Sequence, residues 1–210
     1  MFNEVSLYHL IQTLDPNKTI WIAYSGGLDS QVLLHALSVL RAQISQKVIA
    51  VHINHQLSPN ANDWQTFCKK SCEAHGITFK SFLVEIDAHA GESIENQARD
   101  ARYEKLKPLL NKGDYLFTAH QQNDQAETLL LQLFRGAGVA GLAAMPKIKE
   151  FGQGYLVRPL LDVTREALTE YAKNNNLHWI EDEGNINPRF DRNYIRNEVL
   201  PIIKKKWPEV

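Results

Sequence analysis

The sequence predicts an α/β protein with a mainly parallel sheet and a helical extension at its C-terminal end. A β-branched and aromatic run from Thr19 to Tyr24 is followed by two glycines and then by apolar residues at helical spacing. The apolar stretch from Lys47 to Asn54 lacks polar alternation, which is typical of a strand buried on both faces. Strand and helix patterns then keep alternating, as they do in parallel α/β folds.

The elements follow this plan in chain order. A first amphipathic helix is predicted from Glu4 to Leu14, before Asp15-Pro16 ends it. Residues 19–54 then form two strands joined by one helix, a parallel βαβ unit. The next predicted elements are a helix starting near Asn62, a strand over 78–85, a helix over 94–110, a strand over 115–119 and a helix after His120.

Past Phe151 the regular alternation is lost. We expect one strand over 155–161, one helix over 164–175, a polar loop over 179–185 and an arginine-bearing helix that starts near Arg189. The segment from Arg189 to Lys206 contains six basic and two acidic residues, so this end is basic although the whole chain has a net charge of −1. Such a net charge does not indicate a protein that coats nucleic acid nonspecifically.

Composition excludes several classes of protein. The 210 residues are enough for one full core, and no apolar run approaches the roughly 20 residues that span a bilayer. The first residues lack the plan of a signal peptide, so we expect a cytoplasmic protein. Cys68 and Cys72 lie four residues apart on one predicted helical face, which favours buried packing, and no C-x-x-C motif occurs.

The glycine turn after the first strand is the strongest functional signal. A turn of this kind aims backbone N–H groups and the positive end of a helix dipole at one point, which suits a phosphate. Asp29 beside such a cradle would repel the phosphate unless a divalent cation lies between them, so we interpret it as a Mg²⁺ ligand. No G-x-x-x-x-G-K-[ST] string occurs, which excludes the P-loop of kinases and GTPases. The predicted ATP-binding loop comprises Ser25, Gly26, Gly27, Leu28, Asp29 and Ser30.

Polar residues also follow the later strands, whose carboxyl ends share one edge of a parallel sheet. His52, Asn54 and His55 lack a third ligand at zinc-like spacing, which argues against a metal site. We predict instead that His52 and Asn54 line the nucleotide pocket and that His55 contacts substrate. Arg99 and Arg102 share a helical face and are candidates for contact with a polyanion.

The helix after His120 contributes a further polar group. Its apolar residues follow the i, i+3, i+4, i+7, i+8 pattern, which predicts that Asp124 and Glu127 lie off the buried face. A capping role for Asn123 or Asp124 is the alternative interpretation. The later Gly136-x-Gly138-x-x-Gly141 string is not a dinucleotide fingerprint, because a helix precedes it and no acidic residue follows about twenty positions on. We interpret it as a loop in which Gly136 contacts ATP and Arg135 a phosphate.

These motifs together resemble those of a known family. Ser25-Gly-Gly-x-Asp29-Ser30 after a strand resembles the PP-loop of the ATP pyrophosphatase superfamily. Three further motifs resemble the tRNA(Ile)-lysidine synthase branch, and the likeness runs from about Ile20 to Pro201. They are Thr118-Ala-His120-Gln-x-x-Asp124-x-x-Glu127-Thr, Arg135-Gly136-x-Gly138 and Arg192-Asn193-x-x-Arg196.

The resemblance implies a Rossmann-like fold of the adenine nucleotide alpha hydrolase type and an ATP- and Mg²⁺-dependent ligase. Such an enzyme adenylates carbon-2 of the wobble cytidine of an isoleucine tRNA, after which free lysine displaces AMP. It implies that Asp29, Asp124 and Arg192 are catalytic, with Asp124 holding or deprotonating the lysine ammonium. It also implies a substrate-binding set comprising His55, Arg99, Arg102, His120, Glu127, Arg135 and Arg196.

The resemblance leaves some features open. We expect a catalytic domain over 1–190 and a basic helix or linker over 191–210, because family members usually continue into tRNA-binding domains. Glu183-Gly184 stands where the family has a proline-serine pair. A homodimer is among the expectations, although the sequence does not fix the oligomeric state. Alternative functions are a PP-loop tRNA thiolase, an amide-forming synthetase that uses ammonia, and an ATP sensor without turnover.

Overall fold

A computed structural model describes residues 2–85, 94–139, 141–181 and 191–207. Six strands form one sheet in the order β3-β2-β1-β4-β6-β5. All neighbours are parallel except β5 and β6, which form an antiparallel hairpin at one edge. The strands are β1 (Thr19–Ala23), β2 (Lys47–Asn54), β3 (Thr78–Leu83), β4 (Tyr115–Phe117), β5 (Ile148–Phe151) and β6 (Gly154–Val157).

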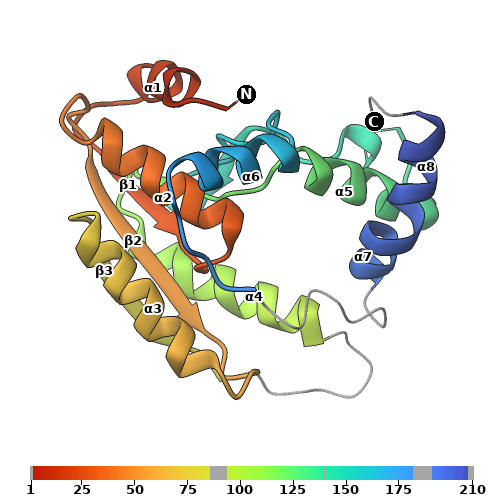
Figure 1. Ribbon diagram of the computed structural model, residues 1–210, viewed down its shortest axis with the longest axis horizontal. Coiled ribbons are helices and arrows are strands. Elements are labelled where there is room, and N and C mark those ends of the chain that lie inside the picture. Colours follow the sequence, from red (N-terminus) through yellow and green to blue (C-terminus); the bar gives the residue numbers. More distant parts are fainter. Residues whose placement is uncertain (1, 86–93, 140, 182–190, 208–210) are drawn as a thin grey trace.

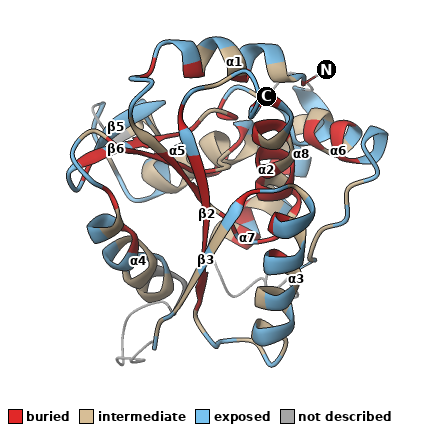
Figure 2. Cartoon of the chain, turned by 90° about the vertical axis from the view of Figure 1, so that its left-hand side faces the viewer, coloured by how far each residue is buried: buried red, intermediate tan, exposed pale blue. Residues whose placement is uncertain are grey.

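Helices cover both faces of the sheet (Figures 1 and 2). They are α1 (Glu4–Gln12), α2 (Leu28–Leu40), α3 (Ala61–Ala74), α4 (Ile94–Leu106), α5 (Gln122–Phe134), α6 (Arg165–Asn174), α7 (Asp191–Tyr194) and α8 (Leu200–Lys206). Short 3-10 turns lie at Lys107–Leu109 and Gly141–Ala143, and a π-helical turn at Ile195–Val199 joins α7 to α8. In the described ranges no helix is both long and apolar enough to cross a membrane.

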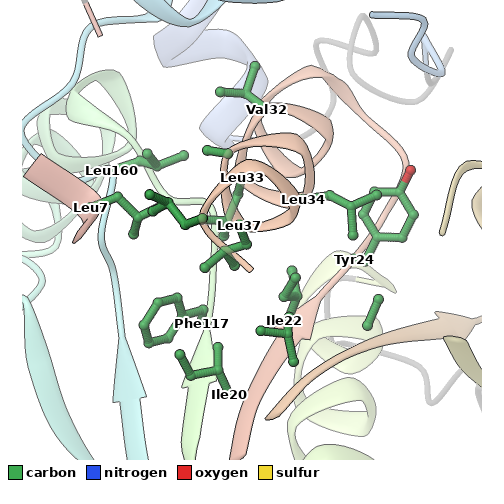
Figure 3. Packing of buried hydrophobic residues seen from close by; sticks show 14 of the residues in the cluster. Leu7, Ile20, Ile22, Tyr24, Val32, Leu33, Leu34, Leu37, Phe117 and Leu160 are labelled. Carbon is green, nitrogen blue, oxygen red and sulfur yellow. The ribbon is translucent and has the colours of Figure 1, made fainter. Parts of the chain in front are cut away.

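The core consists of two apolar clusters, one on each face of the sheet. Ile20 and Ile22 of β1 pack with Phe117 of β4 beneath the leucines of α2, as Figure 3 shows. Trp21, between these two isoleucines, belongs to the opposite cluster with Leu106 at the end of α4. This alternation is the two-residue period of a strand covered on both sides, and it explains why the central strands are unbroken apolar runs.

The strand order determines where a ligand can bind. From β1 the chain crosses to β2 on one side, and β4 later adds on the other side. In parallel α/β sheets, ligands bind beyond the carboxyl ends of the strands where the order reverses. The Ser25–Ser30 loop follows β1 at this position.

Several predicted boundaries differ from the structure. The helix over 94–110 ends as α-helix at Leu106, because Pro108 has no N–H to continue the ladder and a 3-10 turn follows. The strand over 155–161 ends at Val157, whereas α3 begins at Ala61, within one residue of the predicted start. Strand β5 was missed because its first three residues are exposed and give no burial signal.

The predicted orientation of α5 was wrong. Leu129, Leu133 and Phe134 are 40%, 52% and 65% exposed, whereas Glu127 is fully buried. Helix α5 lies against α7 and the π-helical turn, which contribute arginines to its polar side (Figure 1). Ion pairing with a distant segment therefore decided which side of α5 is covered.

Candidate active site

The loop between β1 and α2 is shaped by its glycines and serines. Gly26 has φ +85°, and a Cβ there would lie 2.6 Å from Cδ1 of Ile180. The Gly26 N–H donates to Oγ of Ser30 at 3.1 Å, and that hydroxyl donates to the Gly27 carbonyl at 2.9 Å. The loop is therefore held by its own hydroxyl groups.

The N-terminus of α2 is open toward this loop. Gly27 is the N-cap residue, and no side chain caps the helix there. The N–H groups of the first helical turn have no partner within a helix, and the dipole favours an anion at that point. The Leu28 side chain is buried, so this residue can offer a ligand only its backbone. The geometry fits the predicted phosphate cradle.

Asp29 forms an ion pair that the sequence did not reveal. Nη1 of Arg165, the first residue of α6, lies 2.8 Å from Oδ1 and 2.7 Å from Oδ2 of Asp29. Burial raises the pKa of Asp29 to about 6, an effect opposed by the charge of Arg165 and increased by that of Asp124. Asp29 thus lies within the electrostatic reach of Asp124 on α5.

A cluster of carboxylates and arginines lies between α5 and the C-terminal segment. Glu127 accepts hydrogen bonds from Nε of Arg192 at 2.7 Å and from Nε of Arg196 at 2.6 Å. Nη2 of Arg196 also lies 3.3 Å from Oδ1 of Asp124. The predicted residues Asp124, Glu127, Arg192 and Arg196 are thus brought together, and Glu127 is their buried centre.

Asp124 has a second structural role. Its Oδ2 accepts the Gln121 backbone N–H at 2.9 Å, while the Gln121 side chain accepts the Asn123 N–H at 2.8 Å. These two bonds form a capping box at the start of α5. Capping therefore fixes the Asp124 side chain and leaves Oδ1 directed at Arg196.

His52 and Asn54 are engaged by the protein itself. The His52 ring is buried, and its Nδ1 lies 3.0 Å from the carbonyl oxygen of Tyr24, the residue before Ser25. Burial lowers the His52 pKa, so the neutral ring donates this bond. The Asn54 amide donates to Asn62 and Gln65, each at 3.2 Å. His52 thus holds the end of β1 before the glycine loop, and Asn54 holds the first turns of α3.

His55 and His120 lie in a strongly basic region. Burial lowers the pKa of His120 to about 3, and the charges of Arg158, Arg192, Arg102 and Arg99 add to this effect. Burial, with the charge of Arg102, lowers the pKa of His55 to about 4. The charges of the predicted residues Arg99 and Arg102 thus both act on His120, and that of Arg102 also acts on His55. Such a concentration of cations attracts a polyanion.

Arg135 and Gly136 lie away from this group. They follow the last turn of α5, about 17 Å along the helix from Asp124 at 1.5 Å per residue. Arg135 pairs with Asp191 at 3.7 Å in an exposed position, and a Cβ at Gly136 would meet nothing within 4 Å. The Glu183-Gly184 pair lies outside the described residues.

Sequence reasoning missed two basic residues of the site. Arg158 directly follows β6 and is buried, so the rule that located His52 and His120 at strand ends also applies to it. Its Nη1 donates to the Pro146 carbonyl at 2.6 Å. Arg165 gave no comparable signal, because it begins a helix far along the chain from its partner Asp29.

Comparison with known proteins adds two findings to this geometry. A tRNA(Ile)-lysidine synthase of Coxiella burnetii is 50% identical over all 210 residues, which are 47% of that protein. One of Vibrio cholerae is 43% identical over 204 residues, 96% of this chain and 46% of that protein. The chain thus spans about half the length of the curated relatives it matches.

A solved structure has the same fold. The U34-tRNA thiolase NcsA of Methanococcus maripaludis superposes with a TM-score of 0.77 over 98% of this chain and 73% of that one, at 18% identity. At that identity the likeness concerns the fold alone. The model of the PP-loop domain family matches residues 3–203, which include the Ser25–Ser30 loop, all six strands, and Arg192 and Arg196 of the C-terminal segment. The chain therefore belongs to the PP-loop domain family.

Proposed function

We propose that this chain carries out the chemical steps of a tRNA(Ile)-lysidine synthase. It would bind ATP, adenylate the wobble cytidine of isoleucine tRNA at carbon-2 and join free lysine to that carbon. The single observation that carries the proposal is the cluster of Asp124, Glu127, Arg192 and Arg196 beside Asp29. The match of 96% or more of this chain to about half the length of relatives that bear this name supports it.

The first step needs a site for the triphosphate. In the proposal, the N–H groups at the start of α2 bind the pyrophosphate part of ATP, and the arginines around His120 attract the tRNA backbone. The cytidine O2 attacks the α-phosphorus, and the bond from that phosphorus to the pyrophosphate breaks. Charge on the departing pyrophosphate is stabilised by the oriented N–H groups.

A divalent cation fits the residues at Asp29. Mg²⁺ in nucleotide sites is held by one or two carboxylates together with phosphates and water. Asp29 supplies one carboxylate, and the charge of Asp124 reaches it. A single carboxylate suits a cation that arrives with the nucleotide, where it would neutralise the phosphate charge.

The second step needs an anionic site for lysine. The ε-ammonium must lose a proton before its nitrogen attacks carbon-2 and AMP leaves with the O2 atom. In the proposal Asp124 orients the ammonium and accepts that proton, because its side chain is 14% exposed and its Oδ1 lies 3.3 Å from Arg196, farther than Glu127 does. Glu127 has both oxygens bonded to arginines and no exposed surface, so it positions Arg192 and Arg196 rather than contacting substrate.

The test is ATP conversion to AMP and pyrophosphate with Mg²⁺, free lysine and isoleucine tRNA bearing a wobble cytidine, each component being omitted in turn. AMP release that needs both tRNA and lysine, with lysine entering the tRNA, is the expected result. AMP release that needs tRNA but proceeds with a sulfur donor in place of lysine would favour the thiolase alternative and refute the proposal.

Two variants test the assigned roles. Asp124→Asn is expected to keep tRNA adenylation and lose most lysine transfer, since an amide cannot accept the proton. Asp29→Asn is expected to weaken Mg²⁺-dependent adenylation itself. Asp162→Asn is the matched control, because Asp162 is an exposed acid whose ion pair is with Lys147. Full lysine transfer by the Asp124 variant would remove the proposed base.

A further inference from the structure

Arg165 lies opposite the PP-loop aspartate and is held there by a rigid helix. Thr164 caps α6 by accepting the Ala167 N–H at 3.1 Å, so the helix begins at Arg165. Leu168, Tyr171 and Ala172 bury one face of α6 in the same cluster as the α2 leucines. The Tyr171 hydroxyl also lies 2.9 Å from Nδ1 of His35 on α2. The start of α6 is therefore fixed relative to the PP-loop helix.

The contact with Asp29 uses only part of the guanidinium. Nη1 of Arg165 donates to both carboxylate oxygens, at 2.8 and 2.7 Å. An arginine has five N–H donors, and among the described residues neither Nε nor Nη2 of Arg165 has an acceptor within hydrogen-bond distance. The Arg165 side chain is 46% exposed. Donors of a side chain that contacts the first turn of α2 thus remain available to a ligand.

The chemistry of these donors selects an anion. A guanidinium presents a planar fork that matches phosphate oxygens, and such charge-assisted bonds are among the strongest in proteins. Asp29 is the acidic residue in the first turn of α2, beside N–H groups that also favour an anion. Arg165 and the helix start thus converge on one place from two different elements.

We propose that Arg165 is a ligand of the pyrophosphate part of ATP and that Asp29 holds it in position until the nucleotide binds. This inference rests on the ATP site of the proposed function and adds a residue to it. When ATP enters, Arg165 exchanges one or both bonds with Asp29 for bonds with phosphate oxygens. The Asp29 carboxylate then becomes available to a cation that accompanies the nucleotide.

A purely structural ion pair would behave differently. Exposed ion pairs contribute little to stability, and a pair of that kind would have no influence on which nucleotide binds. A phosphate ligand must instead discriminate between ATP and AMP, because AMP lacks the pyrophosphate. The difference in affinity between ATP and AMP has to appear in binding measurements without turnover, and it has to appear without Mg²⁺ as well.

The experiment compares calorimetric binding of ATP, inorganic pyrophosphate and AMP to Arg165→Gln, Arg165→Lys and the unchanged protein, each with EDTA and with Mg²⁺. Lys173→Gln is the matched control, since it removes an exposed positive charge from the other end of α6. Arg165→Gln is expected to weaken ATP and pyrophosphate binding by about tenfold or more and to leave AMP binding unchanged. Arg165→Lys is expected to recover part of the loss, and Lys173→Gln to lose nothing.

Two results would overturn the proposal. One is unchanged ATP binding by Arg165→Gln, and the other is an equal loss for ATP and AMP, which would indicate a distorted loop. A circular dichroism spectrum and a urea midpoint equal to those of the unchanged protein establish that the variant is folded. If the unchanged protein binds neither ATP nor pyrophosphate, the proposed function itself is refuted, and this inference with it.

Discussion

Nε of Arg196 lies 2.6 Å from Oε1 of Glu127, a side chain with no exposed surface. Arg192 donates to the other oxygen of the same carboxylate at 2.7 Å. One buried acid therefore joins the C-terminal segment to α5 and to the rest of the site. A buried charge is tolerated only when it is paired and hydrogen-bonded, and here two cations satisfy one anion.

Replacing Glu127 with Gln should therefore weaken the whole C-terminal segment. Breaking a buried ion pair by removing one partner costs about 3 to 5 kcal/mol, and the amide still accepts one bond, so we expect about 3 kcal/mol. Urea unfolding measures the loss, and hydrogen exchange should become faster from Asp191 to Lys206. Glu198→Gln, which changes an exposed acid in the same segment, is the control. Equal midpoints for the two variants would contradict the anchoring role.

The parallel sheet and the PP-loop could be predicted from the sequence, but the covered side of α5, which carries Glu127, could not. The sheet was predictable because its central strands are buried on both faces and are therefore unbroken apolar runs. The PP-loop could be found because a phosphate cradle needs glycines and a helix start next to each other. The covered side of α5 could not be predicted, because it is covered through ion pairs with Arg192 and Arg196, which lie more than 60 residues away in the chain.

The same limit applies to other residues of the site. Asp29 was found from its neighbours, but its partner Arg165 is 136 residues distant and no local pattern connects them. Asn54 was predicted beside the nucleotide, and only the structure shows that Asn62 and Gln65 accept its amide protons. Pairings between distant segments are a property of the fold, so local spacing does not contain them.

Gly26→Ala should destabilise the PP-loop much more than Gly27→Ala. A Cβ at Gly26, whose φ is +85°, would come within 2.8 Å of Sγ of Cys68 as well as close to Ile180. A non-glycine residue in this conformation costs on the order of 1 to 3 kcal/mol before any clash. At Gly27 the nearest atom would be 3.6 Å away, an ordinary contact. Urea midpoints without nucleotide compare the two variants, and equal values would mean that the loop adapts.

Acid should destabilise the protein through His120. Its folded pKa of about 3 lies below the usual unfolded value of about 6.5, so between these values the unfolded chain binds more protons. Stability is therefore retained above about pH 6.5 and falls as the pH decreases, by up to about 1.4 kcal/mol per unit from this group. Burial is the main cause of the low pKa of His120, and the charges of Arg158, Arg192, Arg102 and Arg99 add to it.

The measurement is the urea midpoint between pH 7 and pH 5 for the unchanged protein and for His120→Asn. The variant should lose part of the acid sensitivity, whereas the control His9→Asn, at an exposed position on α1, should keep all of it. An NMR titration should show no protonation of His120 down to pH 5. A His120 ring that titrates near its ordinary pKa would contradict the neutral state that the buried site requires.

The two thiols should be unreactive in the folded protein, which bears on the choice between lysine transfer and sulfur transfer. Cys68 and Cys72 have no exposed surface. Burial raises the pKa of Cys72 to about 12 and that of Cys68 well above its ordinary value, so neither forms the thiolate that reacts with electrophiles or metals. Iodoacetamide at pH 8 should label neither thiol in the native chain and both in urea. Rapid labelling of the native chain would instead indicate a reactive cysteine beside the PP-loop, which sulfur chemistry requires and lysine transfer does not.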